Sequence, residues 1–161
     1  MAVNDIQIMS SAVFGSAGSI KYTVAAGATA INAGEPVVRS LGAPTVTAMA
    51  TNKPVVATDF VVGIAMSNST QTASADGTVE VQPLIPGQVY LIKPKVAATW
   101  DTQAEYDALV GDRVLIDLTS GNYTILATDG ATNGCVVMPL DISKYPNLVA
   151  FCFRNGCSDL T

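Results

Sequence analysis

The stretch DFVVGIAMSNSTQTASADGTVEVQPLIPGQVYLIKPK, residues 59–95, decides the fold of this chain. It contains three runs rich in β-branched and aromatic residues, at 60–66, 78–84 and 88–93, and polar segments with glycine separate them. Runs of this composition between turn residues are typical of β-strands. We therefore expect a three-stranded meander, with residues 67–76 as an exposed loop between its first two strands.

The same pattern continues on both sides of this stretch and predicts a chain that is mainly β. Further strands are expected at 21–24, 35–39, 45–47, 113–118, 123–126, 134–140 and 148–153. The period changes once, where Thr102 is followed by Glu105 and Gly111, which indicates a capping box and a helix C-terminus. The expected fold is a small antiparallel β-barrel or sandwich with one short α-helix at about residues 102–110.

A helix of about two turns is marginal by itself, so packing must stabilise it. We expect Tyr106, Leu109 and Val110 to provide that packing. Trp100 precedes the capping box and is expected to hold the helix against the barrel.

The domain organisation predicted is an extended N-terminal arm, residues 1–19, followed by a single β-rich domain, residues 20–161. Residues 10–19 are mostly small and cannot build a core by themselves. Two interpretations of the arm remain open. It either anchors the chain to a partner or links subunits, or it is an edge strand and linker of the same domain.

A loose internal repeat is visible. A glycine and an acidic residue precede a strand at 34–35 and again at 111–112, and another glycine opens a later strand at Gly63 and at Gly134. The spacing differs between the two copies, so the repeat is weaker than in a repeat array. It indicates two interleaved meanders that close into a barrel or sandwich.

Charge and composition exclude several classes of partner. The chain has 161 residues, a net charge of −5 and only 8 Lys and Arg, which are scattered, so we expect no nucleic-acid binding. No apolar run approaches the roughly 18 residues that span a bilayer, so we expect no membrane-spanning segment. The N-terminus does not resemble a signal peptide, so we expect that the chain is not exported by a cleaved leader. Charged residues make up 13% of the chain, about half the usual share. Such a weakly charged surface favours association with copies of the chain or with a large partner.

The chemistry of common active sites is missing from the sequence. Without a histidine, no Ser-His-Asp or Cys-His arrangement can form, and no zinc site can be completed. Asp101 and Glu105 can share a helix face, but acidic residues are favoured at helix starts in any case. We therefore predict no catalytic residue, no metal site and no cofactor.

The chain has three cysteines, an odd number that excludes a complete disulfide framework. Cys152 and Cys157 flank a turn and could meet in an oxidising setting. Buried or half-buried thiols in a reducing cytosol are the favoured interpretation.

The serial order of four motifs resembles the small capsid decoration, or cement, proteins of tailed bacteriophages. The motifs are Ala33-Gly34-Glu35-Pro36-Val37-Val38, Val61-Val62-Gly63-Ile64-Ala65, Gly77-Thr78-Val79-Glu80-Val81 with Gly87-Gln88-Val89, and Leu109-Val110-Gly111-Asp112-Arg113-Val114. The likeness covers roughly residues 20–140. The segment after Pro146 and the two C-terminal cysteines have no counterpart in it.

The resemblance implies a non-enzymatic structural protein of the virion, made in the host cytoplasm, that stabilises the shell. Such proteins bind the outer capsid surface across junctions of the major capsid protein, often as homotrimers. The resemblance also implies that the N-terminal arm contacts the shell or neighbouring subunits. The residues expected to make these contacts are Val3, Ile6, Ile8, Met9, Val13, Phe14 and Tyr22.

Two other functions remain open. The first is a tail, baseplate or fibre-associated structural module of a phage. The second is a carbohydrate-binding β-sandwich or a hydrolase that uses carboxylates. Sugar sites usually present several aromatic residues, and the aromatic share of 6% argues against this last function.

Overall fold

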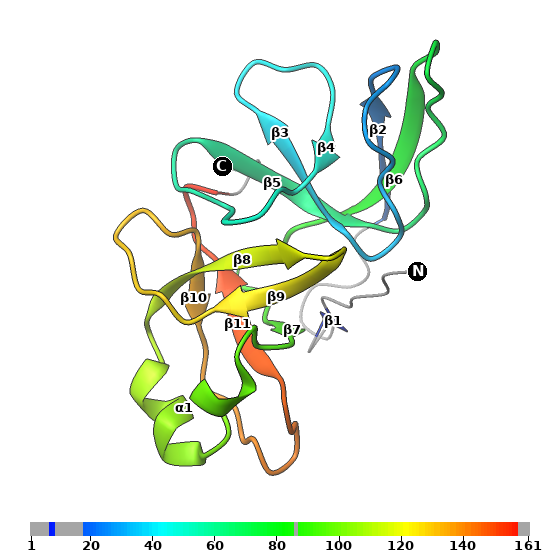
Figure 1. Cartoon of the computed structure of the whole chain (residues 1–161). Helices are drawn as coiled ribbons and strands as arrows, with labels where there is room; N and C mark the ends of the chain where they lie inside the picture. Colours follow the sequence, from blue (N-terminus) through cyan, green and yellow to red (C-terminus); the bar gives the residue numbers. More distant parts are fainter. Residues whose placement is uncertain (1–6, 9–17, 86, 158–161) are drawn as a thin grey trace.

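Figure 1 shows a computed structural model of the chain, which describes residues 7–8, 18–85 and 87–157. This part of the chain forms two antiparallel β-sheets, one short α-helix and one 3₁₀ turn. The five-stranded sheet has the order β2-β6-β5-β3-β4, with β2 (Ile20–Val24), β3 (Pro36–Ser40), β4 (Thr47–Ala48), β5 (Asp59–Ala65) and β6 (Gly77–Pro83). The six-stranded sheet has the order β1-β7-β11-β10-β8-β9, with β1 (Gln7–Ile8), β7 (Tyr90–Ile92), β8 (Arg113–Thr119), β9 (Asn122–Leu126), β10 (Cys135–Val137) and β11 (Val149–Phe153). The prediction of a mainly β fold, a small barrel or sandwich with one short helix, is confirmed.

The third strand of the predicted meander lies in the other sheet. The runs expected at 60–66 and 78–84 form β5 and β6, which pair antiparallel. The run expected at 88–93 forms β7, which pairs with β11 and β1 instead. The meander prediction is therefore wrong at this strand. Pro83 ends β6 because proline cannot continue a ladder, and the next residue, Leu84, is buried in the core beneath the other sheet.

The two sheets repeat one topology. With β1 set aside, β2 to β6 and β7 to β11 have the same strand order, so β2 corresponds to β7 and each later strand to the one five places on. We call these the first and the second unit, and Figure 1 shows the first above the second. In both units the strands curl so that the last returns to the first: Val46 N donates to Thr23 O at 3.0 Å, and Ile125 N donates to Lys93 O at 2.9 Å.

Matching hydrogen bonds align the two units residue by residue. Gly34 N donates to Ala65 O at 2.8 Å, and Gly111 N donates to Val137 O at 3.0 Å. Both glycines have positive φ, 88° and 94°, which favours glycine at this entry to a strand. The strand registers extend this alignment to positions that are buried in both units. Val37 corresponds to Val114, Val46 to Ile125, Ala65 to Val137, Val79 to Val149, and Val81 to Phe151.

Strand β5 contributes side chains to the cores of both units. Val62 and Ala65 pack into the core of the first unit, whereas Val61 and Ile64 pack into the core of the second. All residues of β5 from 61 to 65 are buried. A strand covered on both faces needs apolar residues without alternation, which explains its continuous hydrophobic sequence.

Helix α1 (Gln103–Leu109) covers one end of the second unit. Tyr106 is completely buried, and its ring centroid lies 5.7 Å from that of Trp100 in an edge-to-face contact. Leu109 packs against the same core, as predicted. The prediction for Val110 is wrong: its side chain is 36% exposed, because the helix ends at Leu109 and Val110 has extended dihedral angles.

Residues 7–8 and 18–19 of the predicted N-terminal arm are described, and Gln7 and Ile8 form β1. Gln7 lies opposite Leu91 and Ile8 lies opposite Tyr90, so β1 extends the second unit's sheet beyond β7. The following strand, β2, belongs to the first unit. The N-terminal segment therefore pairs with the second unit through β1 and continues along the chain into the first unit at β2.

Candidate interaction surface

The described residues include cysteines, aspartates and glutamates, the residue types that can bind a metal or take part in acid–base chemistry. No group of three among their cysteines, aspartates and glutamates is close enough to hold a metal ion. Several carboxylates form ion pairs, such as Asp59 with Lys53 at 3.0 Å and Asp129 with Arg113 at 3.3 Å. The surface of the described part therefore offers strand edges, loops and shallow depressions as its candidate sites.

Asp101 and Glu105, the carboxylates considered for catalysis, lie at the start of α1. Glu105 Oε2 accepts hydrogen bonds from Thr102 N at 3.2 Å and from Thr102 Oγ1 at 2.6 Å, and Glu105 N donates to Thr102 Oγ1 at 3.3 Å. The bond from Thr102 lowers the pKa of Glu105, and the hydrogen bond with Glu105 raises the pKa of Asp101. Both side chains are exposed. Their geometry is that of the predicted capping box.

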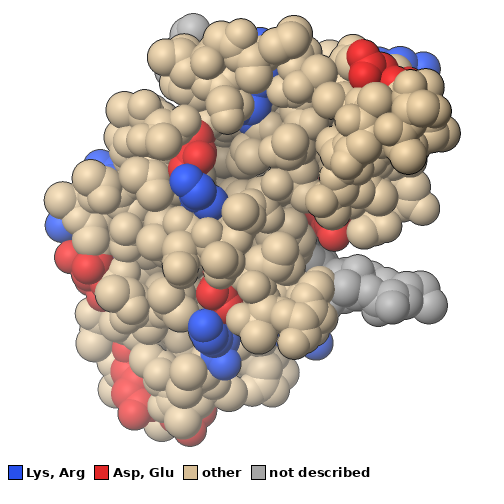
Figure 2. Space-filling view, turned by 45° about the horizontal axis from the view of Figure 1, so that its top comes forward, with Lys and Arg blue, Asp and Glu red and all other residues tan. Residues whose placement is uncertain are grey.

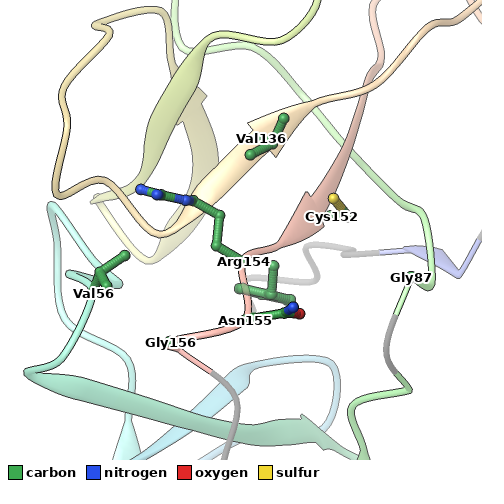
Figure 3. Close-up of a pocket in the computed structure, with 8 residues that line it drawn as sticks. Val56, Gly87, Val136, Cys152, Arg154, Asn155 and Gly156 are labelled. Carbon is green, nitrogen blue, oxygen red and sulfur yellow. The ribbon is translucent and has the colours of Figure 1, made fainter.

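An open depression of about 410 Å³ lies where β11 leaves the second unit (Figure 3). Val56, Val136 and Cys152 provide much of its apolar lining. Arg154 also lines the depression, and its Nη1 donates to Ala131 O and Asn133 O at 2.9 and 2.8 Å. The depression is thus largely apolar, although a charged residue lies at its rim.

All three cysteines are free thiols, as the sequence analysis favoured. Cys135 and Cys157 are buried and Cys152 is half-buried. Burial raises the pKa of each thiol, so all three are protonated at neutral pH. Protonated thiols are poor nucleophiles and poor metal ligands.

A second depression, of about 740 Å³, lies beside α1. Gln103 Nε2 donates to Asp107 Oδ1 at 2.7 Å and to Leu140 O at 3.0 Å, and Lys144 pairs with Asp141 at 3.3 Å. Tyr145 lines the same depression and is 37% exposed. These polar groups bind one another and thereby hold the loop between β10 and β11 against the helix.

The loop at 67–76, predicted to be exposed, is the connection between β5 and β6, and most of its residues are exposed. It does not project alone. Its side chains bind the loop between β2 and β3: Asn68 Oδ1 accepts from Ala33 N at 2.9 Å, and Asp76 Oδ1 accepts from Ala26 N at 2.8 Å. Together the two loops form a tip of the first unit that consists mainly of small, uncharged residues.

Charged side chains are sparse on the molecular surface, and Figure 2 shows large uncharged areas between them. Several large apolar residues are exposed among the described residues. They are Ile20 at 43%, Leu41 at 81%, Met66 at 56%, Val96 at 57%, Val110 at 36% and Tyr145 at 37%. Leu41 lies in the turn between β3 and β4, and Ile20 begins β2. These positions lie on different elements of the fold.

The predicted contact residues fall into two groups. Val3, Ile6, Met9, Val13 and Phe14 lie outside the described residues. Ile8 lies in β1, opposite Tyr90. Tyr22 lies in β2, half-buried, and packs against the core of the first unit. The structure therefore brings Ile8 to the edge of the second unit and Tyr22 to the edge strand of the first.

A buried carboxylate that the sequence analysis missed, that of Asp117, links the two units through its hydrogen bond with Thr51. The carboxylate of Asp117 is 6% exposed, accepts hydrogen bonds from Thr51 Oγ1 at 2.6 Å and Thr119 Oγ1 at 2.5 Å, and pairs with Lys95 Nζ at 2.9 Å. Thr51 follows the first unit's β4, whereas the other partners belong to the second unit. Thr51 and Lys95 lie far from Asp117 in the sequence, so no local sequence pattern predicts this cluster.

We expect Asp117 to make the stability of the chain sensitive to acid. The threonine hydroxyls and Lys95 lower its pKa from 3.8 to about 2. Because the folded pKa is below the unfolded one, the stabilisation is present above about pH 4 and is lost as the pH falls to about 2; it amounts to roughly 1–2 kcal/mol. Urea unfolding from pH 6 to pH 2 should show a smaller loss for Asp117→Asn than for the wild type. Equal pH dependence in both proteins would contradict this assignment.

Comparison with known proteins finds no matching family model, no matching curated protein and no matching solved structure. Among the described residues, none of the helices has the length and apolar character needed to cross a membrane.

Proposed function

We propose that this chain is a capsid decoration protein of a tailed bacteriophage. It binds the outer surface of the assembled shell across junctions of the major capsid protein, as a homotrimer, and stabilises the shell without catalysing a reaction. The motifs on which the resemblance rests are the support for this family. They lie in or beside β3, β5, β6, β7 and β8.

The observation that carries the proposal is the strand addition at β7. The main chain of Gln7–Ile8 completes a sheet edge by pairing with residues 90–91. An N-terminal segment that binds through its backbone can bind the edge of a neighbouring subunit in the same way. One modest contact of this kind, repeated over a closed lattice, is multiplied by avidity.

The surface composition adds support. A weakly charged surface with separate exposed apolar residues, among them Leu41 and Met66, suits a protein that buries several small patches at once. By contrast, Tyr90, Tyr106, Tyr123, Phe151 and Trp100 are all buried, so they are not available to stack on a sugar. The carbohydrate-binding alternative is therefore less well supported than the structural one.

The direct test is binding to expanded capsids that lack decoration protein. The purified chain should co-sediment with them and raise the temperature at which they release DNA or disassemble. Its mass in solution should be three times the 16.6 kDa of one chain. Failure to bind capsids would contradict the proposal, and electron microscopy of labelled virions that places the chain on the tail would favour a tail or baseplate role.

Deletion of residues 1–8 should separate folding from assembly. This variant lacks β1 but keeps all strands of both units, so we expect a cooperative unfolding transition and at least a tenfold loss of capsid affinity. A variant that lacks only residues 1–5 keeps β1 and serves as the matched control. If the longer deletion bound capsids and formed oligomers like the wild type, a role of the arm in assembly would be excluded.

A further inference from the structure

The repeated topology aligns the two edge strands β2 and β7. Ile20 lies opposite Val81, and Tyr90 lies opposite Phe151. Val81 and Phe151 are themselves aligned core positions of the two units. Ile20 therefore corresponds to Tyr90, and Lys21, the next residue, corresponds to the next residue of β7.

Among the described residues, only one of these two aligned edges carries an added strand. Ile8 and Gln7 pair with Tyr90 and Leu91 on the open side of β7. On β2, Ile20 and Lys21 pair with β6 on one side, and no strand of the described part of the chain pairs with their other side.

Exposure of the aligned residues reflects this difference. Directly opposed residues of an antiparallel pair lie on the same face of the sheet. Ile20 is thus on the face of Val81, which is fully buried, yet Ile20 is 43% exposed. Tyr90, the aligned residue beside β1, is 2% exposed. An apolar side chain on the core face at an open sheet margin is the position that an added strand covers.

We propose that the edge of β2 at Ile20–Lys21 is a second strand-acceptor site, which binds an extended peptide segment of a partner protein. The aligned site on β7 shows what kind of segment covers such an edge: one that pairs through its backbone and comes from a sequence of alternating apolar and polar residues, VNDIQI at 3–8. Because Gln7–Ile8 already pairs with β7, the strand that we propose for β2 comes from a second protein. If the proposed capsid function is correct, the donor belongs to the shell, but the site itself rests only on the aligned edges.

Lysine at an edge strand hinders unwanted pairing between copies, because a second β2 would bring another Lys21 against the first. Glu80 lies opposite Lys21 on β6 and offsets part of its charge. The site therefore disfavours copies of β2 and favours a strand of alternating apolar and polar residues that brings no further positive charge.

The test is an NMR titration of the isotope-labelled chain with a synthetic peptide of residues 1–10, MAVNDIQIMS. In the intact chain the peptide should shift the amide signals of residues 20–21 and leave those of 90–91 unchanged, because β1 already covers β7. In the variant that lacks residues 1–8 it should shift both sets. The response at 90–91 in that variant shows that the peptide can add to an edge.

Two variants test the β2 site itself. Ile20→Asp should weaken the peptide's binding at β2 roughly tenfold, since it removes the apolar contact. Leu41→Asp, at an exposed position away from the edge, should not change it. Peptide binding at 90–91 in the deletion variant without any response at 20–21 would overturn the proposal. A response at 20–21 that appears only after residues 1–17 are removed would also overturn it, because the chain's own N-terminal segment would then be the occupant.

Discussion

Substitution of Gly63 by alanine is expected to lower the free energy of unfolding by at least about 3 kcal/mol. Gly63 lies in β5, the strand shared by both units, and has φ of +156°. A Cβ atom there would overlap the backbone O of Gln82 and would lie 2.6 Å from Cγ1 of Val81. The obstacle is the backbone of the neighbouring strand, which cannot move without separating β5 from β6. Urea unfolding followed by far-UV circular dichroism measures the effect.

Two other glycines provide matched controls. Gly42 has φ of +77° and no atom within 4 Å of the position that an alanine methyl group would occupy, so Gly42→Ala should cost about 1 kcal/mol from backbone strain alone. Gly18 has neither a positive φ nor a close neighbour, so Gly18→Ala should be within about 0.5 kcal/mol of the wild type. A Gly63→Ala variant no less stable than Gly42→Ala would show that β5 and β6 are not closely packed at this point.

Tyr106→Phe is expected to destabilise the chain by about 2–3 kcal/mol. The Tyr106 hydroxyl donates to Met138 O at 2.9 Å and accepts from Ala150 N at 2.9 Å, and the side chain is completely buried. This hydroxyl bridges β10 and β11 beyond the end of their regular pairing at Val137. Phenylalanine keeps the packing but leaves the buried N–H of Ala150 and the part-buried C=O of Met138 without their partner, which costs more than the bonds themselves.

Tyr145→Phe is the control for this substitution, because Tyr145 is 37% exposed and water can solvate its hydroxyl. It should change the unfolding free energy by less than about 0.5 kcal/mol. Hydrogen exchange adds a local measurement: the amide of Ala150 should exchange faster in Tyr106→Phe and not in Tyr145→Phe. Unchanged protection of Ala150 would contradict the bridging role.

Local chemistry made most strands and the helix predictable. Runs of β-branched residues between glycine-bearing turns correctly indicated β5, β6 and β8, and the pair Thr102 and Glu105 correctly indicated the start of α1. These features depend on neighbours within a few residues, so the sequence contains the whole signal. The repeat was recognised at Gly34 and Gly111 for the same reason.

The predicted alignment of the later glycines of the repeat was wrong by one position. The sequence analysis matched Gly63 with Gly134, whereas the structure aligns Gly63 with Cys135. Glycine was the signal in the sequence, whereas the strand register sets the alignment, and register depends on partners far along the chain. The role of Cys135 as the counterpart of Gly63 could not be read from residue type.

The sequence by itself determined that the chain is mainly β, where its helix starts and which residue types are absent from any site. Only the tertiary structure decided that β7 crosses to a second sheet, that Ile8 pairs with Tyr90, and that Thr51 and Lys95 meet at Asp117. A hairpin and a crossover begin with the same turn residues, and the choice between them depends on which core buries the following side chains. The edge at Ile20 became visible for the same reason, since an open sheet margin is a property of the assembled strands and not of any one of them.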